Sequence, residues 1–392
     1  MSDQEVRLTV AQHQRLKTVE AAMERRLTNR QAAGALALSV RQVQRLKGKV
    51  QRDGPAGIRH GNTGRCPWNR LDDELRRRIL HLATTTYAGY NFSHLADVLP
   101  VEQDITVSDE TLRRLLRPAG VGRPRRRRKA HRRRRQRRKR EGDLLFLDGS
   151  PHRWFGPDHP MVCLLLASDD ATGKPLYGRF QPQEDRDGCF AVCDRLFRAH
   201  GLPAAFYLDR ASQFIRTDHR AAKDGRPIPP TAFQIAMHTL AVRLIFANSP
   251  QARGRGERLN GSFQDRLVAE LVRYRIHTCQ RATRYVNERF IPRYAKRFAH
   301  PAPDTPAWRD LDPHLDLAGI LCVKATRVVA NDNTVRYGGV TYQLEPPHGR
   351  RHLVRATIEV QQHFDKTIHL LHPHYGPLKA KIISQGKVPN ML

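Results

Sequence analysis

Residues 249–267 read Ser-Pro-Gln-Ala-Arg-Gly-Arg-Gly-Glu-Arg-Leu-Asn-Gly-Ser-Phe-Gln-Asp-Arg-Leu. The stretch opens on a proline and passes through two glycines, which favours an irregular basic loop. It then becomes periodic, with apolar residues at every fourth position: Leu259, Phe263, Leu267 and Leu271. That spacing predicts an amphipathic helix. Glu257, Asn260 and Gln264 share a neighbouring face of this helix, so an acid stands at its start beside a strongly basic loop.

Two further acids end apolar strands upstream of this helix. Asp148 follows Leu-Leu-Phe-Leu and Asp209 follows Ala-Ala-Phe-Tyr-Leu, with 61 residues between the two acids and 48 from Asp209 to Glu257. Mg²⁺ takes oxygen ligands and is usually held by a few carboxylates together with substrate phosphates. Two such ions stabilise both the attacking and the leaving oxygen of a phosphoryl displacement. The set Asp148, Asp209 and Glu257 therefore predicts a catalytic site for two Mg²⁺ ions.

Other acids compete for these roles. Asp169 and Asp170 fall in a hairpin turn, where capping of the turn is the expected role. Asp265 lies two turns beyond Glu257, too far along the helix to share ions with the strand ends. Any one acid alone is more often a surface or capping carboxylate, so the prediction depends on all three standing at the ends of their elements.

Polar and aromatic neighbours add candidates around this site. Asn260 would place a water molecule or a phosphate near the metal ions. Arg253, Arg255 and Arg258 would meet DNA phosphates, although a solvated basic loop is the alternative. His152 and Trp154 either approach the substrate or pack over the first strand.

Three motifs carry a resemblance to a known family. They are Asp-Gly-Ser-Pro-His at 148–152, Asp-Asp-Ala-Thr-Gly at 169–173 and Ala-Asn-Ser-Pro-Gln-Ala-Arg-Gly-Arg-Gly-Glu-Arg at 247–258. The chain resembles an insertion-sequence transposase of the ISNCY type, in the DDE transposase and retroviral integrase superfamily, over roughly residues 25 to 345. The resemblance implies an RNase H-like catalytic core, with Mn²⁺ able to replace Mg²⁺. It also implies assembly as a homodimer or larger on double-stranded DNA, both element ends and target, and a place at the nucleoid in a prokaryotic cytoplasm.

The charge of the chain independently favours a polyanionic partner. The 69 Lys and Arg against 38 Asp and Glu give a formal net charge of +31 over 392 residues. Residues 123–140 hold 14 basic residues and no acid, which is less than half of that excess. An acidic membrane surface is the main alternative to nucleic acid. No apolar run approaches the length needed to span a bilayer, so no membrane partner is expected.

The six cysteines show no zinc-like double pair. Cys189 and Cys193 stand four residues apart in an expected helix and could supply half of a metal site. No second pair completes the set. Free thiols in a reducing cytoplasm are the simpler interpretation.

Two basic helical modules are expected before the core. A helix over 11–27 precedes a helix-turn-helix pattern in which Thr28 and Ser39 cap the two helices. Its second helix would offer one side to a DNA groove: Arg41, Gln42, Gln44, Arg45 and Lys47. Ala37 departs from the turn glycine common in this motif. A small helical bundle with a solvated basic face is the alternative.

The second module has helices near 71–84 and 91–99 and a third that opens at Ser108. The third helix would present Arg113, Arg114 and Arg117 to a base edge or to phosphates. The Arg-rich run cannot form a core; alone it would be a solvated linker, and next to DNA it would neutralise phosphates. A nuclear import signal is the third reading of that run.

The chain is therefore expected to be multidomain: N-terminal all-α helix-turn-helix modules, a central α/β RNase H-like core and a small C-terminal β-barrel. A Gly-Gly hairpin at 338–339 and the basic residues Arg350, Arg351 and Arg355 mark the barrel. The expected ranges are 1–50 for the first DNA-binding domain, 51–70 for a Gly/Pro linker, 71–122 for the second DNA-binding domain, 123–142 for the Arg-rich linker, 143–300 for the core and 318–375 for the barrel.

Three functions fit these features. The first is a transposase that binds the ends of an insertion sequence, cleaves there and transfers the strand to target DNA. The second is a domesticated, non-cleaving DNA-binding regulator, which the intact acidic triad disfavours. The third is an RNA-cleaving nuclease of the same fold, which the two expected sequence-reading modules disfavour.

Overall fold

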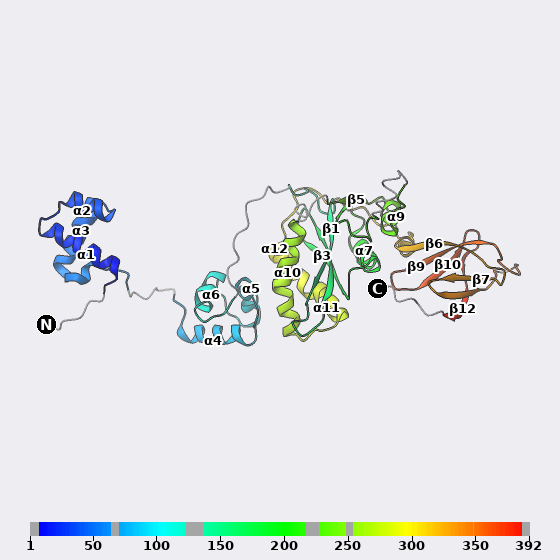
Figure 1. Ribbon diagram of the computed structural model, residues 1–392, viewed down its shortest axis with the longest axis horizontal. Helices are drawn as coiled ribbons and strands as arrows, with labels where there is room; N and C mark the ends of the chain where they lie inside the picture. Colours follow the sequence, from blue (N-terminus) through cyan, green and yellow to red (C-terminus); the bar gives the residue numbers. More distant parts are fainter. Residues whose placement is uncertain are drawn as a thin grey trace. The chain divides into compact units, whose positions relative to one another are not determined.

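The computed structural model describes residues 8–63, 70–122, 136–216, 227–247, 254–347 and 349–385 (Figure 1). The chain divides into two compact units, Met1–Arg77 and Arg78–Leu392. Within the described ranges no helix is both long enough and apolar enough to cross a membrane. The structure is a mixed α/β, multidomain one with a helical N-terminal region.

The first unit is built from three capped helices, α1 (Val10–Met23), α2 (Asn29–Leu36) and α3 (Val40–Asp53). Thr9, Thr28 and Ser39 each form a capping box with the glutamine three residues on. The box satisfies backbone N–H groups that the first helical turn leaves without partners. Ala37 ends α2 in the left-handed conformation, at φ 52°. An alanine therefore takes the turn position where a glycine was expected, at a cost of about 1–2 kcal/mol.

Two boundaries of this unit differ from the sequence prediction. The first helix was expected to reach residue 27 but ends at Met23, and Arg25 follows at a positive φ. The linker expected from residue 51 begins later, because α3 continues to Asp53 and a 3₁₀ turn covers Gly54–Ile58. Ile58 is buried with Leu16 and Val19. Because Ile58 is buried, the first residues of the expected linker belong to the core of the helical unit.

The second helical module comprises α4 (Asp73–Thr84), α5 (Phe92–Glu102) and α6 (Asp109–Leu116). Its three helices lie close to the predicted ranges. Asn91 and Ser108 cap α5 and α6 through their side-chain oxygens. The apolar sides of these helices are buried at Leu95, Val98, Leu99, Leu112 and Leu116.

A five-stranded mixed sheet forms the centre of the second unit. Its strands are β1 (Leu145–His152), β2 (Val162–Asp169), β3 (Pro175–Gln181), β4 (Ala205–Leu208) and β5 (Arg243–Phe246), in the order β3-β2-β1-β4-β5. The β1–β2 and β2–β3 pairs are antiparallel, and the β1–β4 and β4–β5 pairs are parallel. Strands β1 and β4 begin where the apolar runs before Asp148 and Asp209 predict them, and β2 and β3 flank the predicted hairpin turn.

Helices cover both faces of this sheet (Figure 1). Alternation along β1 and β2 sends Leu145, Leu147 and Leu165 to one face, where they pack with α7 (Arg186–His200) and α9 (Ala232–Thr239). Leu164 and Leu166 point to the other face and pack with α10 (Gly254–Arg273), α11 (Cys279–Tyr285) and α12 (Ile291–Phe298). A π-helical turn at Val286–Phe290 joins α11 to α12. The core is therefore three layers deep, with the β1 strand in its middle.

The C-terminal module contains two sheets. After the short helix α13 (Leu317–Ile320), one sheet has the order β11-β10-β9-β6 and the other β12-β8-β7. The strands are β6 (Cys322–Val328), β7 (Thr334–Tyr337), β8 (Val340–Leu344), β9 (Thr357–His363), β10 (Ile368–His372), β11 (Gly376–Leu378) and β12 (Ala380–Gln385). Gly338 and Gly339, at φ 57° and 79°, form the predicted two-residue turn between β7 and β8.

This module differs from the expected barrel in closure and in length. Its described strands form two sheets that share the apolar cluster of Val335, Leu344, Leu353, Val360 and Leu370, and no closed barrel is formed among them. The module also continues past residue 375, because β12 pairs with β8 as far as Gln385. The third strand of the smaller sheet therefore comes from a segment that the sequence prediction had left out.

Candidate active site

The sheet register brings Asp148 and Asp209 to the same level. In the parallel β1–β4 pair, Leu145 lies opposite Phe206 and Phe146 opposite Tyr207. The same offset carried forward sets Asp148 beside Asp209. Asp209 directly follows β4, as predicted, whereas β1 continues to His152, so Asp148 lies within its strand and not at the predicted end. Strands in a sheet are about 4.8 Å apart. Phe146 and Tyr207 contact edge to face on the same side of the sheet, so the two acids project from a shared face.

Helix α10 covers that face and contacts Asp148 directly. Asn260 Nδ2 donates to Asp148 Oδ2 at 3.0 Å, and Gln264 Nε2 donates to Ser150 Oγ at 3.1 Å. A Cβ atom built on Gly256 would lie 3.5 Å from the same Oδ2. The first turns of α10 are thus packed against β1 through Asn260 and Gln264, as their shared face predicts, and a contact of Glu257 with the same site stays a prediction.

Glu257 lies one helical turn before Asn260, in the first turn of α10. Its side chain is exposed, unlike that of Asn260. Among the residues with described positions, no group of three or more His, Cys, Asp or Glu side chains is close enough to hold a metal ion. Two neighbouring carboxylates, one of them bonded to an amide, are donors that suit a hard divalent cation.

Another acid, which the sequence prediction did not consider, lies against β1 at Gly149, on the sheet face opposite to the Asp148 side chain. Glu184 stands between β3 and α7, and its Oε2 is 1.9 Å from the position that a Cβ on Gly149 would take. Gln213 Nε2, from the segment after Asp209, donates to Glu184 Oε1 at 2.6 Å. The signal available in the sequence was an acid pair directly before a helix and after a buried strand.

The thiol of Cys163 on β2 lies near acidic side chains. Burial raises the pKa of Cys163 to about 12, and the charges of Glu184 and Asp148 act in the same direction. A cavity of about 550 Å³ opens beside Glu184 and Gln213. It is also lined by residues of α9 and β6, including Ile235 and Lys324.

Asp169 caps the hairpin turn, as its place in the turn predicts, whereas the contacts of Asp170 include groups outside the turn. Asp169 Oδ2 accepts from the backbone N–H and the hydroxyl of Thr172, and Oδ1 accepts from Gly142 N–H. Burial raises the pKa of the Asp169 carboxyl. Asp170 Oδ2 accepts from Arg138 N–H at 2.9 Å.

Arg255 has a partner inside the protein. Its guanidinium contacts the carboxylate of Asp170, whose side chain is 0% exposed, while the Arg255 side chain is 20% exposed. The contact joins the first turn of α10 to the β2–β3 hairpin. Arg255 pairs with a buried acid in this structure, and its expected contact with DNA phosphates stays a prediction. Arg258 is exposed as expected, and Arg253 lies outside the described residues.

The other candidates around the strand have structural partners. Trp154 is fully buried and donates from Nε1 to Ser150 O at 2.9 Å. His152 contacts its ring edge to face. Of the two interpretations for this pair, packing over the first strand is the one the structure supports. Cys189 and Cys193 are free, buried thiols in the core, and burial raises the pKa of both.

The predicted groove-reading residues of α3 separate into two groups. Arg41, Gln44 and Arg45 are exposed. Lys47 is half-buried and donates to Ala22 O at 2.9 Å and Asn29 Oδ1 at 3.3 Å. The side chain of Gln42 accepts from Ser39 N–H in the capping box. Gln42 and Lys47 therefore have roles in holding the helices that the sequence prediction did not give them.

The basic residues of α6 are engaged with acids on the same helix. Arg113 and Arg114 form ion pairs with Glu110, and Arg113 also lies 3.7 Å from Asp109. Arg117 ends the helix and is exposed. These pairs are partly solvated and weak, so the guanidinium groups can exchange partners.

Comparison with known proteins gives the family. No family model matches the chain. It is 34% identical over 354 residues to a putative transposase of Sinorhizobium fredii strain NBRC 101917 / NGR234, covering 90% of this chain and 77% of that protein. It is 30% identical over 366 residues to the transposase for an insertion sequence of Streptococcus pneumoniae, covering 83% of this chain and 76% of that protein.

Solved structures similar to the chain include retroviral integrases. The catalytic core domain of HTLV-2 integrase matches with a TM-score of 0.28 at 13% identity, covering 38% of this chain and 86% of that one. A simian T-cell lymphotropic virus intasome chain matches with a TM-score of 0.32 at 11% identity, covering 78% of this chain and 100% of that one. The sequence matches to the two transposases extend over most of both partners, and on that ground the chain belongs to the family of insertion-sequence transposases.

Proposed function

We propose that the chain is a DNA transposase that cleaves at the ends of an insertion sequence and joins the freed strand to target DNA. One observation carries the proposal: Asp148 and Asp209 stand in register on adjacent parallel strands, with Asn260 of α10 bonded to Asp148. The strand order β3-β2-β1-β4-β5, with helices on both faces, supports the expected RNase H-like core. The similarity to transposases supports the same conclusion.

The residues fit a divalent metal site by the chemistry of their oxygen donors. Asp148 and Asp209 would hold Mg²⁺ from two adjacent strands, and Glu257 would add a carboxylate from α10. When bound, two Mg²⁺ ions supply charge stabilisation for the attacking and leaving oxygens of a phosphoryl displacement. Mn²⁺ is expected to substitute. Asn260 holds the Asp148 carboxylate in place through its amide, so it limits how far that carboxylate can rotate.

The reaction then has two displacements at phosphorus. In the first, water attacks the phosphodiester at the element end, the P–O3′ bond breaks, and a 3′ hydroxyl is released. In the second, that hydroxyl attacks a phosphodiester of target DNA, and the leaving 3′ oxygen takes up a proton. Exposed basic residues of both helical modules and α10 would hold the duplexes by their phosphates: Arg41, Arg45, Arg117 and Arg258. Two ends joined in concert require a homodimer or larger assembly on DNA.

The test is cleavage of a labelled duplex that carries the element end, with Mg²⁺ or Mn²⁺. Glu257→Gln and Asp148→Asn should each lower cleavage at least ~100-fold while duplex binding is retained. Asp265→Asn is the matched control, because it removes an exposed acid from the same helix two turns further on. Cleavage that survives both site substitutions would refute the assignment. Specific binding without cleavage by the parent chain, with either metal, would instead favour the DNA-binding regulator.

A further inference from the structure

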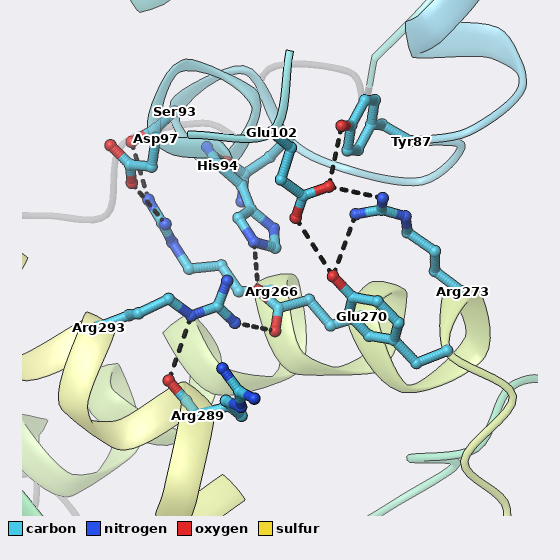
Figure 2. Close-up of polar contacts among 12 residues, drawn as sticks. Tyr87, Ser93, His94, Asp97, Glu102, Arg266, Glu270, Arg273, Arg289 and Arg293 are labelled. Atoms are coloured by element: carbon cyan, nitrogen blue, oxygen red, sulfur yellow. Dashed lines mark hydrogen bonds and ion pairs between the residues drawn. The ribbon is translucent and has the colours of Figure 1, made fainter. Parts of the chain in front are cut away.

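Helix α5 of the second helical module contacts the C-terminal half of α10 through buried charged groups (Figure 2). His94 Nε2 lies 2.7 Å from Glu270 Oε1, and both side chains are only 3% exposed. Two ion pairs flank this contact. We call this contact the α5–α10 seam and define it by six residues: His94, Asp97 and Glu102 on α5, and Arg266, Glu270 and Arg273 on α10.

The outer pairs of the seam have good geometry and several partners. Arg266 donates from Nη1 to Asp97 Oδ2 at 2.8 Å and from Nη2 to Ser93 Oγ at 2.9 Å. Arg273 Nη2 donates to Glu102 Oε2 at 2.6 Å. Tyr87 also donates to that Oε2, at 3.0 Å. Charged pairs of this kind fix a docking geometry, because separating them leaves buried charges without compensation.

Glu270 joins the seam to the rest of the core. Besides His94, its carboxylate contacts Tyr285 of α11 and Arg293 of α12. In Figure 2 the His94 ring and the Arg293 guanidinium converge on this one carboxylate from two elements. A single acid on α10 thus ties together the helical module and two helices that pack on the catalytic sheet.

The seam and the candidate active site are two ends of one helix. Arg266 and Glu270 follow Glu257 by 9 and 13 residues, which is about 14 and 20 Å at 1.5 Å per residue. Asn260 and Gln264 attach one side of α10 to β1, and the seam holds a different side of the same helix. Because an α-helix is stiff over this length, a shift at the seam moves Glu257 and Asn260 as well.

We propose that the α5–α10 seam is an intramolecular docking surface through which the second helical module positions Glu257 and Asn260 for the reaction. Arg266, Glu270 and Arg273 are then positioning residues that touch neither substrate nor metal. The inference rests on the proposed function. It adds that a module expected to bind DNA also sets the geometry of the site, so that cleavage depends on docking as well as on binding.

The first test exchanges the charges of one pair. Glu102→Arg and Arg273→Glu each set like charges against each other, and the double variant restores opposite charges. A displacement of about 1 Å can cost on the order of 100-fold in rate, so each single variant should lower kcat about 10- to 100-fold with KM for the duplex little changed. The double variant should recover most of kcat. Asp97→Asn is a milder change that keeps the shape of the seam, should a charge reversal fail to fold.

The second test links the second helical module to α10 covalently, through an engineered disulfide. A Cβ built on Gly89 lies 4.0 Å from the Cβ of Ala269, within the range that a disulfide spans. Gly89→Cys with Ala269→Cys, added to Glu102→Arg, should restore kcat when oxidised and lose it again when reduced. The reduced form is the control for strain at Gly89, which has φ +83°. Intact mass after alkylation, with two fewer modified thiols, reports the bond independently of activity.

The outcomes separate this inference from the proposed function. A parent chain that does not cleave refutes the proposed function, while disulfide formation still measures docking. A parent that cleaves, with seam variants that cleave equally well, refutes the seam inference alone. The chain with only the Gly89→Cys and Ala269→Cys disulfide is a further test. If it is inactive until reduced, the seam inference is refuted, because the seam would then have to open during the reaction.

Discussion

Arg255→Ala tests whether this arginine serves the fold or the DNA. Asp170 is fully buried, and the contacts to it include Arg255 and the N–H of Arg138. Breaking a buried pair by removing one partner costs about 3–5 kcal/mol. Because the Arg138 N–H remains, we expect the lower end, about 3 kcal/mol, a change of roughly 150-fold in the folding equilibrium.

Urea unfolding followed by circular dichroism measures this loss. For a unit that spans Arg78–Leu392, about 3 kcal/mol lowers the melting temperature by roughly 4–5 °C. Adding Asp170→Asn to Arg255→Ala removes the buried carboxylate that has lost its arginine, so the double variant should regain much of the stability. Arg258→Ala is the matched control: Arg258 is exposed three residues further on, and its loss should change stability by less than about 0.5 kcal/mol.

One combination of results would assign Arg255 to DNA binding. If Arg255→Ala costs under about 1 kcal/mol and weakens duplex binding as much as Arg258→Ala does, Arg255 is a phosphate contact and its pairing with Asp170 is incidental. A salt titration of binding gives the second readout, because each lost phosphate contact lowers the salt slope by about 1.

Three further predictions follow from the site and the helical modules. Asp148→Asn should abolish cleavage while leaving the duplex dissociation constant within about threefold, measured by gel shift and end-labelled cleavage. Lys47→Ala should lower the stability of the first unit by about 1–2 kcal/mol, because it removes half-buried bonds to two carbonyl-type oxygens, whereas Arg45→Ala should leave stability unchanged and weaken duplex binding. Burial lowers the pKa of His94, so below its ordinary pKa of 6.5 the unfolded chain takes up a proton that the folded chain excludes. Stability should therefore fall as the pH drops from 7 to 5, by at most about 1.4 kcal/mol per pH unit, and His94→Gln should flatten that dependence in thermal melts. Groups facing His94 are Glu270, Arg266, Arg293 and Tyr90.

Local signals were sufficient for the elements that carry the candidate site. An apolar run followed by an acid predicts a strand, and β1 and β4 begin where those runs are, although β1 continues past Asp148 to His152. The fourfold spacing from Leu259 predicts α10, and the shared face of Asn260 and Gln264 is the face that meets β1. These features depend on residues a few positions apart, so the sequence is enough to find them.

Boundaries that depend on burial were less predictable. Ile58 extends the first helical unit into a segment whose glycines and prolines indicate a linker, and β12 adds a strand beyond the expected end of the C-terminal module. Ile58 is stabilised by packing against α1, and β12 by pairing with β8. Both partners are distant in the sequence, so the local composition of these segments does not predict the contacts.

The sequence by itself determined the strands and helix that carry the candidate site, the three acids on them, and the excess of basic charge. Only the tertiary structure decided which polar and charged groups meet. Arg255 pairs with an acid 85 residues away and His94 with one 176 residues away. A chain with 69 basic residues offers each acid many partners. The choice among them follows from packing, because only burial makes the loss of a partner costly.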